Sequence, residues 1–226
     1  MHNFIKSLLL VLLCIFISGC SGGKTYTKDS IVQESDDFYI NAETITFKKG
    51  NATKLASDID SDTNGWIEDF KLRVSDNMLK TNELPNLHIR HKIYTDNETL
   101  ISLVTEKYLY ISGVHGNTWW KARNFDYANN CYLSLSDLFY DDSYIKRLNT
   151  LMDETATGDP EQYHDLWEHP EIKEENFENF YIDGKSLVIF FQPYELSFYA
   201  KGVVKFPIEA SNLRGYLKEE YLKIMS

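Results

Sequence analysis

Cysteine is scarce in this chain of 226 residues, which contains three. Cys14 and Cys20 lie in or beside an apolar N-terminal stretch, so Cys131 is the one cysteine in the remainder. A disulfide framework is therefore excluded, and Cys131 has no partner for a redox pair. We interpret Cys131 as a buried thiol on a strand.

Basic residues are also in the minority. The chain has 23 lysines and arginines against 34 aspartates and glutamates, and its formal net charge is −11. An acidic surface repels nucleic-acid phosphates and anionic lipids, which argues against nucleic-acid binding. The same charge favours cationic partners through electrostatic steering.

Long apolar runs are absent after the N-terminus, where the apolar Ser7–Phe16 follows the positively charged Lys6. This run is too short to span a bilayer, and residues 17–20 (Ile-Ser-Gly-Cys) are similar to a bacterial lipobox. We expect residues 1–19 to be a lipoprotein signal peptide and Cys20 to carry acyl chains such as palmitate, two of which give stable anchoring. An ordinary secretion signal and an uncleaved anchor are the alternatives. The expected location is extracytoplasmic, with a lipid anchor in the cell membrane.

The first half of the mature chain changes character twice. Residues 20–37 are polar and include Gly22 and Gly23, so they predict a flexible tether. Strand-like sequence follows at Tyr39–Phe47. Apolar residues then recur at helical spacing from Ile59 to about Leu79, which predicts a helix.

Two strings in the chain are typical of metal sites. Asp60–Glu68 has oxygen ligands at positions one, three and five of a calcium loop and glycine at six, but position twelve is Lys71 instead of glutamate. An acidic helix is the favoured interpretation, and calcium binding stays open. His164 and Glu168 would share a face of a helix that runs to Trp167, but the charged residues after Pro170 favour a solvated connector. No metal or cofactor is predicted.

Strands dominate the middle of the chain. Residues 87–93 alternate between apolar and polar side chains, and a turn at 95–98 leads to a second strand at 100–112. His88 and His91 fall on opposite faces of the first strand, so they cannot share a metal ion. A helix is expected at about Tyr144–Glu154.

The C-terminal part predicts two strands joined by an aromatic loop. Leu187–Phe191 is apolar without interruption, which indicates a central strand with both faces covered. Val203–Ile208 alternates, and Pro207 places it at an edge or a strand end. A helix is expected from Ser211. Together the elements predict an α+β fold of antiparallel sheets with helices packed on one face, in two subdomains.

The loop Gln192–Gly202 carries a family resemblance. Tyr194-Glu195 and Tyr199-Ala200-x-Gly202, placed between a buried strand and a strand that ends in isoleucine, resemble the extracellular domain of RsiV-type anti-sigma factors. Phe198 stands where that family usually has proline. The family pairs this domain with an upstream domain that also occurs in the peptidoglycan deacetylase PdaC. The resemblance thus implies a PdaC-accessory-like α+β domain at 38–130 and an RsiV-like domain at 131–226.

A second stretch, Gly113–Phe139, resembles the same family through a Gly-x-His-Gly segment, an Asn-Phe-Asp at 124–126 and a Leu-x-Asp-Leu-Phe at 135–139. The glycines beside His115 permit a bend that aims the imidazole sideways. His115 therefore lies at the edge of a site or caps backbone groups at the bend. Trp119 and Trp120 lie on opposite faces of the next strand, so one is expected in the core and the other is a candidate for exposure.

No catalytic residue is predicted, because the chain has no nucleophile elbow, phosphate loop, zincin pair or usable Cys/His spacing. The resemblance implies a module that binds a partner outside the cell, and the partner of the RsiV family is the basic protein lysozyme. We expect a lysozyme-like protein or peptidoglycan to be bound by Pro193, Tyr194, Glu195, Phe198 and Tyr199, together with His115. The alternatives are a hydrolase or deacetylase-like enzyme acting on the cell wall, and a structural envelope lipoprotein.

Overall fold

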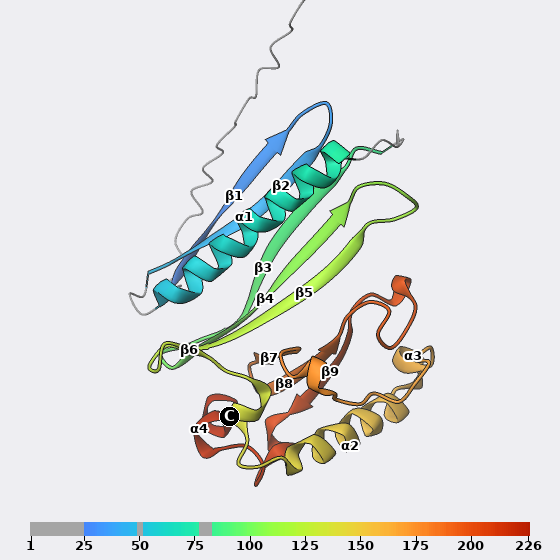
Figure 1. Ribbon diagram of the computed structural model, residues 1–226. Coiled ribbons are helices and arrows are strands. Elements are labelled where there is room, and N and C mark those ends of the chain that lie inside the picture. The colour runs from blue at the N-terminus through green and yellow to red at the C-terminus, as the bar shows by residue number, and fades with distance from the viewer. Residues whose placement is uncertain (1–24, 49–51, 77–82) are drawn as a thin grey trace, which may run out of the picture. The chain divides into compact units, whose positions relative to one another are not determined.

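The computed structural model describes residues 25–48, 52–76 and 83–226, which form two compact units (Figure 1). Unit 1 contains the described residues up to His91 together with Lys107–Asn117, and unit 2 contains Lys92–Glu106 and Thr118–Ser226. The sequence predicts two domains that meet at residue 130, and the two units have different boundaries. The long strands β3 (Asn86–Asp96) and β4 (Leu100–Tyr110) each contribute to both units.

Unit 1 packs one helix on strands. β1 (Tyr26–Glu34) and β2 (Tyr39–Phe47) form an antiparallel hairpin. α1 (Thr53–Asp76) then crosses over, so that β3 pairs with β2 in parallel. A parallel pair needs such a crossover, and the β2–β3 pair departs from the expected antiparallel pairing. Ile67 and Phe70 of the helix pack against Ile40, Ala42, Leu87 and Ile89 of the two strands.

The tether expected at residues 20–37 is contradicted from Tyr26 to Glu34, because these residues form β1. The strand is largely exposed, so it shows no apolar alternation. It is held instead by backbone pairing with β2 over its whole length and by Lys28, whose Nζ lies 3.1 Å from Glu43 Oε2. An edge strand of this kind can be polar, which is why composition alone did not reveal it.

The calcium-like string Asp60–Glu68 lies inside α1, which is one continuous helix. A calcium loop has to wrap its ion, and a helix cannot do so with consecutive residues. The acidic-helix interpretation is therefore correct. Across the described residues, no three His, Cys, Asp or Glu side chains are grouped to hold a metal ion.

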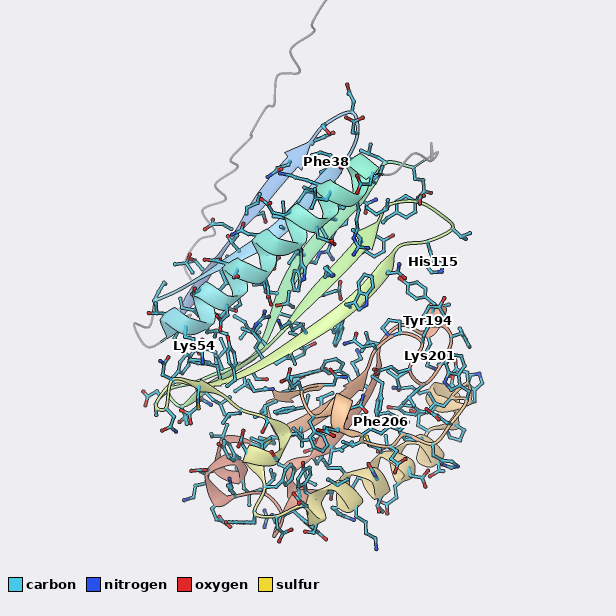
Figure 2. All side chains as sticks on the ribbon, viewed as in Figure 1. Phe38, Lys54, His115, Tyr194, Lys201 and Phe206 are labelled. Carbon is cyan, nitrogen blue, oxygen red and sulfur yellow. The ribbon has the colours of Figure 1, made fainter. Side chains whose placement is uncertain are left out.

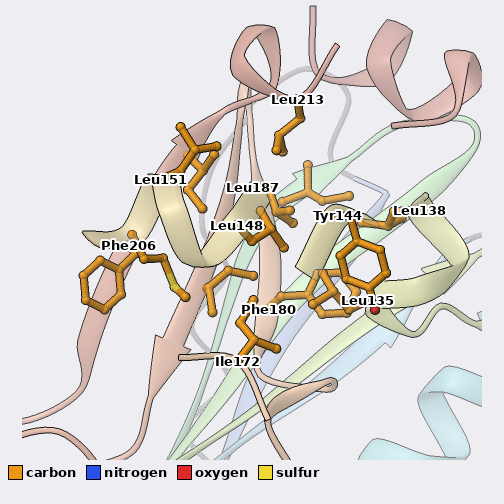
Figure 3. Close-up of a cluster of buried hydrophobic side chains, with 14 of the residues drawn as sticks. Leu135, Leu138, Tyr144, Leu148, Leu151, Ile172, Phe180, Leu187, Phe206 and Leu213 are labelled. Atoms are coloured by element: carbon orange, nitrogen blue, oxygen red, sulfur yellow. The ribbon is translucent and has the colours of Figure 1, made fainter. Parts of the chain in front are cut away.

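Unit 2 contains the three-stranded antiparallel sheet β7 (Phe180–Asp183), β8 (Ser186–Phe191) and β9 (Val204–Glu209). On one face of β8, Leu187 and Ile189 pack against α2 (Ser143–Gly158) in the cluster of Figure 3. On the other face, Val188 and Phe190 pack with Val104 and Trp120. Both faces are covered, which confirms the central strand predicted from its uninterrupted apolar run. β9 alternates between buried and exposed residues at the edge, also as predicted.

A buried polar network joins the strands of unit 2. Asn124 of β5 (Asn117–Asp126) accepts a 2.7 Å hydrogen bond from the hydroxyl of Ser102 and donates a 2.8 Å bond to the carbonyl of Phe180. The Ser102 hydroxyl oxygen in turn accepts a 2.8 Å bond from the N–H of Ile182. This part of the Asn-Phe-Asp motif is therefore structural, and its Asp126 caps the following turn by accepting from Ala128 and Asn129.

Short elements complete unit 2, and two of them differ from expectation. The helix expected to reach Trp167 is α3 (Pro160–Tyr163), so His164 and Glu168 share no helical face. The helix expected from Ser211 is divided at Gly215, whose φ is +85°, into a 3₁₀ turn and α4 (Glu219–Ile224). The remaining elements are β6 (Cys131–Tyr132), which carries the half-buried Cys131, and the 3₁₀ turns η2 (Leu135–Leu138), η3 (Glu174–Asn176), η4 (Tyr199–Lys201) and η5 (Ala210–Leu213). In the part of the chain that the structure describes, no helix is both long and apolar enough to cross a membrane.

Candidate binding surface

The loop Gln192–Gly202, here called the aromatic elbow, begins with a tight turn. The N–H of Gln192 donates a 2.6 Å hydrogen bond to the carboxylate of Glu195, and the N–H of Glu195 donates a 3.0 Å bond to the carbonyl of Gln192. Tyr194, the third residue of this turn, has φ of +73°. Glycine is the usual residue there, because a side chain in the left-handed region costs about 1 kcal/mol.

Gln192 fixes the start of the elbow to β5. Its side-chain carbonyl accepts a 3.0 Å hydrogen bond from the N–H of Trp120, and its side-chain amide donates a 2.7 Å bond to the carbonyl of the same residue. The amide thus pairs with Trp120 as a neighbouring strand would. Trp120 is half-buried and packs against the core cluster that contains Phe190, while Trp119 is 41% exposed, so the two rings differ in the expected direction.

The inner side of the elbow is fixed to the segment after α3. Leu196 is buried in the core, and the hydroxyl of Ser197 donates a 2.9 Å hydrogen bond to the carbonyl of Asp165. Lys201 Nζ lies 2.8 Å from the Asp165 carboxylate and also contacts the carbonyl of Gln162. The hydrogen bond from Lys201 lowers the pKa of Asp165 below its ordinary value.

Trp167 joins the elbow from the same segment. Its backbone N–H donates to the carbonyl of Leu196 and its indole N–H donates to the carbonyl of Glu195, both at 3.1 Å. Sequence reasoning missed Trp167 as a site residue. Its signal is a large aromatic residue in a charged connector, but its contact with the elbow depends on contacts remote in sequence.

The elbow and the segment bonded to it carry exposed rings. Tyr194 is 56% exposed, Phe198 48% and Trp167 57%. The half-buried Tyr199 supports this surface, since its ring centroid lies 5.5 Å from that of Tyr194. Figure 2 labels Tyr194 and Lys201 on this loop. Exposed aromatic groups on a fixed backbone are typical of a recognition surface. The structure therefore brings together Pro193, Tyr194, Glu195, Phe198 and Tyr199.

His115 belongs to unit 1, so it is described apart from the elbow. Gly113 has φ of +101°, and a Cβ on Gly116 would lie 2.5 Å from the Tyr108 ring, so both glycines are needed at this hairpin tip. His115 is exposed, and its Nδ1 lies 2.7 Å from the carbonyl of Gly116. This contact matches the alternative in which the histidine caps a backbone group.

Two cavities of about 230 and 280 Å³ lie beside the elbow and share Glu168 and His169 as lining residues, and the two together are here called the furrow. The smaller one is also lined by Glu171 and Glu195, and the larger one by Trp167 and Asp153. Glu168 and Glu171 are exposed, whereas a carboxyl that serves as a general acid is normally enclosed by apolar groups. The furrow is therefore suited to binding more than to acid–base chemistry.

The chain is similar to known proteins in both sequence and fold. Residues 136–211, which include the elbow, match the model of a family described as a protein of unknown function, DUF3298. Two solved structures of DUF3298 family proteins have the same fold. One from Pseudomonas aeruginosa PAO1 has a TM-score of 0.63 at 13% identity and covers 87% of this chain and 96% of its own. One from Bacteroides fragilis NCTC 9343 has a TM-score of 0.62 at 15% identity and covers 89% and 97%. The α+β fold class predicted from the sequence is thus confirmed.

One characterised relative is similar in sequence. Over 156 residues, the chain is 27% identical to peptidoglycan-N-acetylmuramic acid deacetylase PdaC of Bacillus subtilis strain 168. The match covers 63% of this chain and 31% of PdaC. Because the chain spans about a third of that protein, the match does not carry its activity over.

Proposed function

We propose that this chain is an extracytoplasmic binding module whose aromatic elbow recognises a basic protein such as lysozyme. We propose further that acylated Cys20, which lies outside the described residues, anchors it to the cell membrane. The observation that carries the proposal is the exposure of Tyr194, Phe198 and Trp167 on a backbone that hydrogen bonds hold in place. A preorganised loop loses little conformational entropy on binding.

Charge supports a basic partner. The chain has a formal net charge of −11, and the exposed glutamates Glu168 and Glu171 lie in the furrow beside the elbow. Opposite charge raises association rates, while aromatic anchors supply most of the affinity. The RsiV-like sequence of the elbow supports a lysozyme-like protein in particular.

The similarity to PdaC supports a location at the cell wall. The name of that relative refers to peptidoglycan, and its match with this chain extends over 156 residues. A module that acts beside peptidoglycan would meet cell-wall-degrading proteins there.

Titration of the full chain with lysozyme, followed by calorimetry, tests the proposal. Tyr194→Ala is expected to weaken binding about tenfold or more, as loss of an interface aromatic does. Tyr140→Ala is the matched control, because Tyr140 is 59% exposed in the same unit and its hydroxyl contacts the N–H of Glu219 instead of the elbow. Equal loss in both variants, or no binding by the wild type, refutes recognition through the elbow.

A further inference from the structure

The furrow beside the elbow has a chemistry of its own. Its two cavities, of about 230 and 280 Å³, meet at Glu168 and His169. Each is smaller than the roughly 300–1,000 Å³ that drug-sized ligands occupy, so each has room for a group about the size of one sugar ring. Two adjoining cavities of this size suit neighbouring units of a linear chain.

The larger cavity has an aromatic wall. Trp167 lines it, and the indole N–H bond to the carbonyl of Glu195 restrains the ring. Polar groups line the same cavity, and among them His169 Nδ1 lies 2.7 Å from Asp153 Oδ1. A cavity lined by both an aromatic ring and hydrogen-bonding groups suits a sugar unit, which has C–H groups on one face and hydroxyls at its edge.

The smaller cavity is negatively charged. Glu168, Glu171 and Glu195 line it together with Lys173, so carboxylates outnumber the lysine ammonium. Glu195 already accepts the N–H of Gln192, which leaves the exposed Glu168 and Glu171 to meet a ligand. Phe191 and Leu196 are the apolar residues that line it. Such a cavity favours an ammonium group and disfavours an acidic sugar.

We propose that this furrow binds an oligosaccharide of amino sugars whose nitrogens are free ammonium groups. One sugar unit packs on Trp167, and the ammonium of its neighbour lies against Glu168 and Glu171. The furrow shares Trp167, Glu168 and Glu171 with the surface proposed for the basic protein, but the ligand is different. Its test uses different probes and variants, so either proposal can fail while the other stands.

The test compares two tetrasaccharides that differ in charge: glucosamine tetramer, and the same tetramer with every nitrogen acetylated. Calorimetry on the full chain at about pH 6 keeps amines charged and carboxylates ionised. The glucosamine tetramer is expected to bind about tenfold or more tightly than the acetylated one, since each exposed charge pair is worth a factor of roughly two to five. Equal affinity for both, or no binding of either, overturns the proposal.

Variants separate the furrow from general acidity. Glu168→Gln with Glu171→Gln is expected to weaken binding of the glucosamine tetramer about tenfold, while Glu219→Gln with Glu220→Gln on α4 leaves it unchanged. Trp167→Ala is expected to weaken binding of the glucosamine tetramer about fivefold. Trp167→Phe, which retains a ring without the N–H, is expected to weaken it less. Equal effects of the two glutamine pairs overturn the proposal. The proposal is also overturned if tetralysine binds as tightly as the glucosamine tetramer and loses affinity in the same variants, because the furrow would then recognise charge alone.

Discussion

The backbone N–H of Gln192 and the carboxylate of Glu195 are joined by a 2.6 Å hydrogen bond, and this contact closes the turn that presents Tyr194 to solvent. Tyr194 has φ of +73°, which is a strained backbone conformation for a residue with a side chain. Its side chain is also 56% exposed, so folding buries less than half of it. A residue that is strained and exposed at once is a candidate for a functional role. The turn therefore presents the Tyr194 ring for binding at a cost to the stability of the fold.

Tyr194→Gly is expected to stabilise the protein while it removes the recognition ring. Glycine adopts positive φ without strain, although it also loses more entropy on folding, and a net gain of about 0.5–1 kcal/mol in the free energy of unfolding is expected. Urea denaturation measures it. Tyr199→Gly is the control, because Tyr199 has no positive φ and its loss is expected to destabilise. A loss of stability in Tyr194→Gly would show that the tyrosine serves the fold.

The contact between Asp165 and Lys201 predicts a pH dependence. The hydrogen bond from Lys201 lowers the pKa of Asp165, so the folded state binds the proton less well than the unfolded state. The carboxylate therefore stabilises the fold above its unfolded pKa of about 3.9, and this contribution is lost as the pH falls through the lower folded value. Asp165→Asn is expected to lower the urea midpoint at neutral pH, and the difference from wild type should close in acid.

The exposed Asp183 at the end of β7 provides the comparison for that experiment. Asp183→Asn is expected to change the midpoint little at any pH. If the difference between Asp165→Asn and wild type stays constant down to about pH 3, the ion pair with Lys201 is not its cause.

Local patterns predicted the elements whose apolar residues follow one period. The uninterrupted run Leu187–Phe191 indicated a strand covered on both faces, and the structure covers it with α2 on one side and Trp120 on the other. The helical spacing of Ile59 and Phe70 indicated α1. These predictions succeed because burial dictates periodicity within a single segment.

Features that depend on distant contacts could not be predicted in this way. β1 is polar and forms because its backbone pairs with β2, and Trp167 reaches the elbow through bonds to residues about thirty positions later. The sequence also gives no sign that Tyr194 would occupy a glycine-like conformation. The composition of the elbow suggested a binding surface, but its shape depends on Gln192, Asp165 and Lys201.

Cys20→Ser tests the anchor. The residues before Cys20 are similar to a lipobox, and acylation of this cysteine would hold the chain on the membrane. The wild type is expected to fractionate with membranes and to incorporate labelled palmitate, whereas Cys20→Ser is expected to do neither. Cys131→Ser is the control. Incorporation of label by Cys20→Ser would assign the lipid to another residue.

Asn124→Asp tests the buried network of unit 2. Asn124 donates a 2.8 Å hydrogen bond to the carbonyl of Phe180 and is 3% exposed. An ionised carboxylate of the same shape cannot donate, so it would face that carbonyl unpaired, at an expected cost of about 2–4 kcal/mol at neutral pH. Protonation restores a donor. The pKa of the new carboxyl in the folded state is therefore expected to lie above its unfolded value. The loss in free energy of unfolding relative to wild type should then shrink as the pH falls through that raised pKa.

Urea denaturation of Asn124→Asp and wild type at a series of pH values measures this effect. Asn124→Ala is the control, since it removes both the donor and the acceptor and has no group to titrate, so its deficit should not depend on pH. Ser102 would lose its acceptor in the alanine variant but keep it in the aspartate variant, which separates the two bonds. If the aspartate variant is as stable as wild type at neutral pH, the Phe180 carbonyl does not need the Asn124 amide, and this hydrogen bond does not contribute to the stability of unit 2.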